Sequence, residues 1–208
     1  MGWPSLDRSR LSAPAWSALA YSTLVVVAFG ISLALGRSPL DREPWLPTSG
    51  IEAAFSSLVL GLAVAALTLL ATRALGARTK WARALEAELH PIVRGQTDGA
   101  LSVMALASGV GEEIFFRGLL SPWIGVVLSS LAFGAVHQVR GPGRIGWMAS
   151  AAALGLAFAL VFGATGSLLG PVVGHTLINF WNLRGLRSRS PAAALPPPAR
   201  LGGILRRR

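Results

Sequence analysis

Six long apolar segments constrain this chain more than any other feature. In chain order they cover residues 13–36, 51–75, 99–120, 122–138, 145–165 and 167–183. A helix of about 20 apolar residues crosses the roughly 30 Å of hydrocarbon in a bilayer. The pattern therefore predicts an all-α fold, a polytopic membrane helix bundle with about six transmembrane helices.

The composition argues against a soluble helical protein. Charged residues make up 13% of the chain and hydrophobic residues 52%. Soluble domains carry roughly 25% charged residues, so this chain has too little polar surface to cover six apolar helices. It also has no cysteine, which excludes disulfides, Cys-ligated zinc and a thiol nucleophile.

The basic residues predict how the bundle is oriented. With the N-terminus in the cytoplasm, sixteen of the 19 lysines and arginines fall on the cytoplasmic side and two on the other. The positive-inside rule then predicts an integral membrane protein with both termini in the cytoplasm. We attribute the net charge of +10 to contact with anionic membrane lipid rather than with nucleic acid.

A more polar segment separates the second and third apolar segments. Between Arg78 and Gly99, residues Trp81, Leu85 and Leu89 recur at helical spacing among charges, which predicts an amphipathic helix at the membrane surface. His90 in this segment is expected at the surface.

The chain divides into three parts on this basis. They are residues 1–98, with two transmembrane helices and the interfacial segment, residues 99–184, a core of four transmembrane helices, and residues 185–208, a basic tail that we expect to be disordered.

Ionisable and amide side chains are confined to three of the six segments. Charged groups at membrane depth usually face a protein interior or a cavity, so we expect one shared site. Its candidates are Glu112, Glu113 and Arg117 in the third segment, His137 in the fourth, and His175, Asn179 and Asn182 in the sixth.

Helical geometry separates the two glutamates. Glu113 and Arg117 are four residues apart and can pair on one helix face, whereas Glu112 points about 100° away. A carboxylate can take a proton from a water that attacks a carbonyl, and imidazole and amide N–H groups can stabilise the resulting oxyanion. Counting about 1.5 Å per residue places His137 roughly 10 Å nearer the cytoplasm than Glu112.

Three motifs carry a family resemblance. GEEIFFRG contains Glu-Glu-x-x-x-Arg, FGAVH contains Phe-x-x-x-His, and HTLIN contains His-x-x-x-Asn, each in its own apolar segment and in this order. Together they resemble the CPBP family (CAAX protease and bacteriocin-processing), also called the Abi family. The resemblance covers about residues 100–183.

The resemblance implies an intramembrane glutamic endopeptidase. By it, Glu112 is the general base and holds the nucleophilic water with His137, while His175 and Asn179 form the oxyanion hole. Glu113 and Arg117 would brace the helix, and no metal or other cofactor is required. The expected substrate is a membrane-anchored or lipid-modified precursor, cut near its C-terminus in a bacterial inner membrane, in a myxosortase-like sorting role.

Two alternatives remain open. Glu112, His137 and His175 would also suit a catalytic zinc ion as two imidazoles and one carboxylate, although the sequence has no HExxH motif. Intramembrane Glu and His also serve proton relays, so a non-catalytic immunity or scaffold protein, or a proton-coupled transporter, is the second alternative. The oligomeric state is left open.

Overall fold

The helices begin and end close to the predicted segments. The computed structural model describes residues 12–40 and 42–189, and within these ranges it contains helices and no strand. The elements are α1 (Ala13–Ala34), α2 (Gly50–Arg78), α3 (Lys80–Val93), α4 (Asp98–Glu112), η2 (a π-helix, Glu113–Leu120), α5 (Ser121–Val136), α6 (Arg144–Thr165) and α7 (Leu169–Ser188). The all-α prediction is therefore confirmed.

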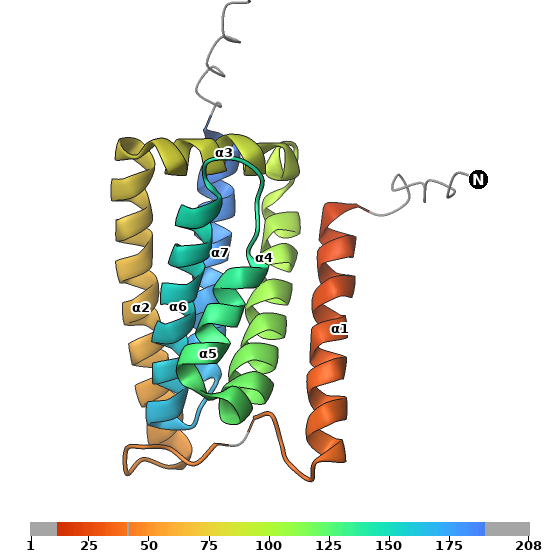
Figure 1. The fold of residues 1–208 in the computed structure, drawn as a ribbon, viewed down its shortest axis with the longest axis vertical. Helices are drawn as coiled ribbons and strands as arrows, with labels where there is room; N and C mark the ends of the chain where they lie inside the picture. Colours follow the sequence, from red (N-terminus) through yellow and green to blue (C-terminus); the bar gives the residue numbers. More distant parts are fainter. Residues whose placement is uncertain (1–11, 41, 190–208) are drawn as a thin grey trace, which may run out of the picture.

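The long helices run side by side, and α3 lies across one end of them (Figure 1). Helix α1 begins, and α7 ends, at the end that α3 covers. The Thr79 and Thr97 hydroxyls cap α3 and α4 by accepting the backbone N–H three residues later, as N-cap threonines commonly do. The predicted amphipathic segment is thus a helix lying over the bundle end.

Within the part of the chain that the structure describes, four stretches are long and apolar enough to cross a membrane, namely Ala13–Ala34, Gly50–Gly76, Asp98–Val136 and Arg144–Thr165. The chain is an integral membrane protein by this criterion, but the count of six spans stays a prediction. The third stretch is one run of 39 residues that joins two predicted spans, and α7 is absent from the four. Its polar stripe, which includes His175 and Asn179, lowers its hydropathy.

A single glycine breaks the 39-residue run in its last third. Gly125 has φ 83° and ψ 161° inside an otherwise helical stretch, a backbone region that only glycine occupies without strain. The chain reverses its direction there, so α5 runs back beside η2 and packs against α6 rather than continuing the direction of α4 (Figure 1). A Cβ at this position would meet no atom within 4 Å; the constraint is backbone conformation, not space.

Close backbone contacts fix α7 against α2 and α4. A Cβ on Gly170 would lie 1.8 Å from the Ser57 carbonyl oxygen of α2, and one on Gly174 would lie 2.5 Å from the Gly61 oxygen. A Cβ on Gly109 of α4 would lie 2.3 Å from Thr176 Oγ1. Membrane helices associate closely where small residues allow it, and here these residues set the position of the polar stripe on α7.

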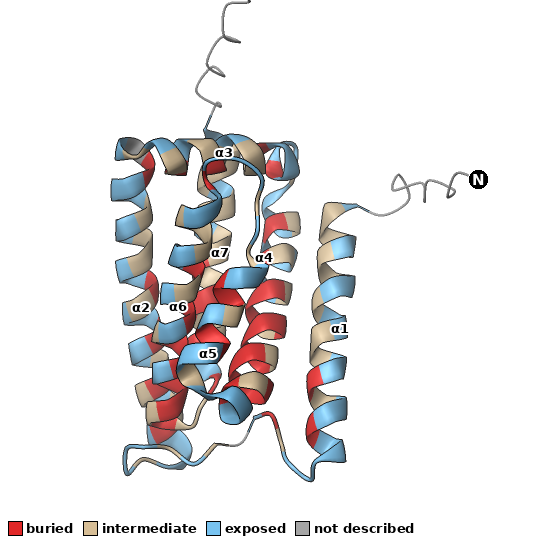
Figure 2. Cartoon of the chain, viewed as in Figure 1, coloured by how far each residue is buried: buried red, intermediate tan, exposed pale blue. Residues whose placement is uncertain are grey.

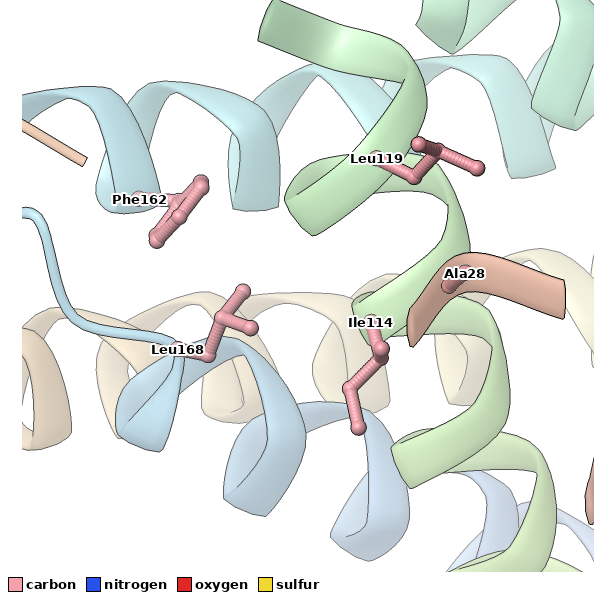
Figure 3. Close-up of a cluster of buried hydrophobic side chains, with 5 residues drawn as sticks. All are labelled: Ala28, Ile114, Leu119, Phe162 and Leu168. Carbon is pink, nitrogen blue, oxygen red and sulfur yellow. The ribbon is translucent and has the colours of Figure 1, made fainter. Parts of the chain in front are cut away.

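The buried residues gather where the helices face one another, and the outward faces are exposed (Figure 2). One apolar cluster joins Ala28 of α1 to Ile114 and Leu119 of η2, with Phe162 and Leu168 on the other side (Figure 3). The exposed faces carry many leucine, valine and isoleucine side chains, as lipid-facing surfaces do.

Two details differ from the sequence expectations. His90 is buried on α3, with 9% of its surface exposed, rather than at the surface. It turns toward the bundle beside Leu85 and Val93, which are also buried. Helix α7 continues to Ser188, into the predicted tail, most of which lies outside the described residues.

Candidate active site

The two glutamates lie where the helix changes its winding. Glu112 is the last residue of α4, and Glu113 is the first residue of the π-helix η2. Both are buried, with 7% and 0% of their surfaces exposed. Short π-helical turns within α-helices are frequent at functional sites, and this one places two neighbouring carboxylates in the protein interior.

Glu113 joins two helices through its two oxygens. Its Oε2 lies 3.1 Å from Arg117 Nε, and its Oε1 accepts a hydrogen bond of 2.7 Å from His175 Nδ1 on α7. The first contact is the i,i+4 pair expected from the sequence. The second was not expected, and it makes Glu113 the link between the arginine and the imidazole.

The Phe133 ring packs against the side chains of Arg117, His137 and His175. The Arg117 guanidinium lies 4.3 Å from the Phe133 ring centroid, a cation–π contact. The ring also packs on His137 and edge-on against His175. Because the Phe133 carbonyl accepts a hydrogen bond of 2.7 Å from His137 Nδ1, one residue sets the position of three polar side chains.

Glu112 faces both imidazoles. Its Oε2 lies 3.5 Å from His175 Nε2 and 3.8 Å from His137 Nε2. In each histidine Nδ1 is already bonded to an oxygen that can only accept, so Nδ1 carries a proton and Nε2 is the nitrogen turned to Glu112. The depth difference counted from the sequence is absent, because Gly125 and the π-helix bring His137 level with Glu112.

Asn179 lies at the edge of the same group. Its Nδ2 donates a hydrogen bond of 2.8 Å to Ser108 Oγ, and Ser108 lies one turn before Glu112 on α4. An amide nitrogen has two hydrogens, so the second remains for another acceptor. The sequence prediction named Asn179 but gave no site role to Ser108. Asn182, at i+7 from His175, makes no side-chain hydrogen bond with the described residues of this group.

Three further side chains enclose the site. Phe158 of α6 stacks on the His175 ring with centroids 5.8 Å apart, and Trp147 meets the His137 ring edge-on at 5.7 Å. Tyr21 of α1 packs its Cβ and its carbonyl oxygen against Gly111, which directly precedes Glu112. The spacing of polar residues did not reveal these three, because two are apolar and Tyr21 is isolated in its segment.

The described part of the chain holds no group of three or more His, Cys, Asp or Glu side chains arranged to bind a metal ion. The sequence suggested Glu112, His137 and His175 as zinc ligands. Glu112 Oε2 lies 3.5 Å from His175 Nε2 and 3.8 Å from His137 Nε2. Glu113 contacts Arg117 and the Nδ1 side of His175, rather than the Nε2 atoms that face Glu112.

The segment that carries most of this site is similar to a known protein family. Residues 99–181 match the family described as Type II CAAX prenyl endopeptidase Rce1-like. That family is one of the CPBP proteins, and because of this similarity we call residues 99–181 the CPBP segment. The CPBP segment contains six of the seven candidate residues, whereas Asn182 and helix α1 with Tyr21 lie outside it. Comparison with curated proteins and with solved structures found no match.

Proposed function

We propose that the protein is an intramembrane glutamic endopeptidase in which Glu112 activates water. The observation that carries this proposal is the meeting of Glu112 Oε2 with the Nε2 atoms of His137 and His175 in a buried site. The CPBP segment supports the same class of reaction, since its family consists of CAAX-type proteases.

The donor pattern supports a nucleophilic water between Glu112 and His137. With Nδ1 protonated, a neutral His137 presents a lone pair on Nε2, 3.8 Å from a carboxylate oxygen. Two acceptors at this separation each take one hydrogen of a single bridging water. Glu112 removes one of these protons as general base, and the water oxygen attacks the substrate carbonyl carbon.

His175 and Asn179 then stabilise the oxyanion of the tetrahedral intermediate. To donate from Nε2 while Nδ1 stays bonded to Glu113, His175 acts as an imidazolium. Its charge, with that of Arg117, balances the two glutamates, so the buried group has no net charge. Asn179 supplies its second Nδ2 hydrogen, since the first is bonded to Ser108. Fixed donors of this kind contribute strongly in sites that exclude water.

Collapse of the intermediate completes the cycle. The C–N bond breaks, and the protonated Glu112 gives its proton to the departing nitrogen. One product ends in a carboxyl group and the other in an amine, and Glu112 returns to its carboxylate form. Glu113 and Arg117 keep their charges throughout and hold His175 and Glu112 in place.

The substrate must reach this site from within the membrane. His137 is the most exposed member of the group, with 18% of its side-chain surface open against 9% for Glu112 and 3% for His175. It also lies where α5 ends and residues 137–143 leave the helix. We therefore propose that a membrane-anchored or lipid-modified precursor enters past His137 and is cut near its C-terminus.

The setting follows from the same proposal. We assign the protein to a bacterial inner membrane, with α3 and both termini on the cytoplasmic side and lipid around the bundle. Residues 99–184 form the catalytic core, and residues 1–98 provide α1, α2 and the interfacial helix. A myxosortase-like role, with a C-terminal sorting signal as substrate, is the specific form we favour.

Mass spectrometry of membrane-protein C-termini tests the reaction. Native cells carrying the wild-type protein are compared with cells carrying Glu112→Gln, which keeps the shape and removes the base. We expect a precursor to keep its full C-terminus in the variant, while Glu52→Gln, at the exposed start of α2, behaves as wild type. If all termini are unchanged although Glu112→Gln is inserted and folded, the protein is not this peptidase.

A further inference from the structure

Ser108 is a buried serine of α4 that lies beside the proposed oxyanion hole. It is 6% exposed and lies four residues before Glu112, so the two side chains share one face of the helix. Its hydroxyl donates a hydrogen bond of 3.1 Å to the Ala105 carbonyl oxygen, and its oxygen accepts one of 2.8 Å from Asn179 Nδ2 on α7. The helix that carries Glu112 is thus bonded to a proposed oxyanion donor on another helix.

Close packing of α4 against α7 brings this short side chain to Asn179. The two helices lie side by side and run in opposite directions, since α4 begins and α7 ends at the end that α3 covers (Figure 1). At Gly109, the next residue on α4, a Cβ would lie 2.3 Å from Thr176 Oγ1 and 3.0 Å from the Thr176 backbone nitrogen. Because a glycine here lets the two backbones approach, a serine side chain is long enough to reach across the interface.

The two bonds of Ser108 fix which way the Asn179 carboxamide faces. A hydroxyl has one hydrogen, and a carbonyl oxygen can only accept, so the Ser108 hydrogen goes to Ala105. The Ser108 oxygen then has only lone pairs to offer, and Asn179 must turn its NH2 group toward it rather than its carbonyl oxygen. An asparagine amide has nearly the same shape when its oxygen and nitrogen are exchanged. The hydroxyl therefore selects one of two otherwise similar orientations.

This orientation decides whether Asn179 can stabilise an oxyanion. With one Nδ2 hydrogen bonded to Ser108, the second remains for an oxygen of the substrate. A carboxamide turned the other way would present its carbonyl oxygen instead, which repels a developing negative charge. Donors contribute most when they are in place before the charge develops, and the Ser108 hydroxyl holds this donor in place.

We propose that Ser108 is a positioning residue for the oxyanion hole, which holds the Asn179 carboxamide in the orientation that donates to the reacting carbonyl oxygen. This inference rests on the proposed peptidase function. Ser108 contacts neither the water nor the substrate and acts through Asn179 alone. Helix α4 thereby supplies the base, Glu112, from its last turn and orients the oxyanion donor from the turn before it.

The bond is measurable without any substrate. The chain has two asparagines, Asn179 and Asn182, so ¹⁵N labelling of asparagine side chains gives two NH2 signals from the full chain in lipid nanodiscs. Asn179→Ala removes one signal and thereby assigns both. We expect Ser108→Ala to shift the Asn179 signal and to leave the Asn182 signal in place. The control is Ser102→Ala, which removes an exposed hydroxyl that bonds its own helix and should move neither signal. An Asn179 signal that stays in place in Ser108→Ala would overturn the inference.

Kinetics separates the hydroxyl of Ser108 from the packing of its side chain. Ser108→Thr and Ser108→Val introduce side chains of the same shape, of which only the first keeps a hydroxyl. The substrate is a synthetic peptide spanning the cleavage site that the C-terminal comparison identifies. Loss of one neutral hydrogen bond predicts a kcat about 3- to 10-fold lower in Ser108→Val than in Ser108→Thr, with equal KM. Equal kcat values in the two variants would show that the hydroxyl has no part in the reaction.

A double variant tests whether Ser108 acts through Asn179. Asn179→Ala alone should lower kcat by about 100-fold or more, the usual loss for one oxyanion donor. If Ser108 only orients this donor, Ser108→Val and Ser108→Thr should have the same kcat once Asn179→Ala is also present. A difference of about 3- to 10-fold that persists in that background would mean that the hydroxyl acts by another route, and the positioning role would be wrong.

Failure of this inference differs from failure of the function on which it rests. If Glu112→Gln is inactive and Ser108→Val matches Ser108→Thr in kcat, the peptidase proposal stands and Ser108 serves packing alone. If Glu112→Gln keeps full activity, the peptidase proposal fails and the role of Ser108 in the reaction fails with it, although the Asn179 signal still reports the bond.

Discussion

The buried pair of Glu113 and Arg117 allows a quantitative test of how the site is held together. Their side chains are 0% and 1% exposed, and Glu113 Oε2 lies 3.1 Å from Arg117 Nε. Removing one partner of such a pair leaves a buried charge without compensation, which costs about 3–5 kcal/mol. We therefore expect Glu113→Gln and Arg117→Met each to lower the unfolding free energy by about this amount.

The double variant should be much less damaging than the sum of the single variants. With both charges gone, no uncompensated ion remains, and we expect a coupling energy of about 2–3 kcal/mol. Glutamine is chosen because its carbonyl oxygen still accepts the His175 Nδ1–H. Unfolding is followed by tryptophan fluorescence during titration of mixed micelles with sodium dodecyl sulfate.

Asp98 and Arg187 provide the matched control. Asp98 Oδ1 and Arg187 Nη2 are 2.5 Å apart, but their side chains are 51% and 26% exposed. Exposed pairs contribute about 0.2–1 kcal/mol, so Asp98→Asn and Arg187→Met should show little coupling. If the buried pair proves additive, or couples no more strongly than this exposed pair, burial is not the reason for its importance.

Two further predictions concern helix packing and metal. Gly170→Ala should destabilise the bundle by about 1–3 kcal/mol, the usual cost of overpacking, because its Cβ would lie 1.8 Å from the Ser57 carbonyl oxygen. The control is Gly30→Ala, whose Cβ would meet no atom within 4 Å. It should leave the unfolding free energy unchanged in the same detergent titration. Because the proposed step uses only protein side chains, dialysis against a chelator should leave peptide cleavage unchanged; activity that is lost and then restored by zinc would establish the metalloprotease alternative instead.

Features that depend on local periodicity were predictable from the sequence. Apolar runs of transmembrane length located the helices within a few residues, because hydropathy in a bilayer dominates other preferences. The spacing of Glu113 and Arg117 likewise predicted their contact, since residues four apart share a helix face. The roles of the site residues remain proposals.

Features that depend on departures from regular helix were not predictable. Counting a constant rise per residue placed His137 at the wrong depth, because that count takes no account of the π-helix at Glu113 or of the reversal at Gly125. The bond from His175 to Glu113 joins residues 62 positions apart, and the contact of Tyr21 with Gly111 joins two different helices. Neither leaves a periodic signal in the chain.

The backbone of Gly125 has a consequence for how this chain can vary. Its φ and ψ angles lie in a region essentially restricted to glycine, where any other residue costs about 1–3 kcal/mol. Every single-base change in a glycine codon that alters the amino acid introduces a side chain or a stop. Every single-base substitution that replaces Gly125 should therefore strain or remove the turn that brings α5, and with it His137, back toward Glu112.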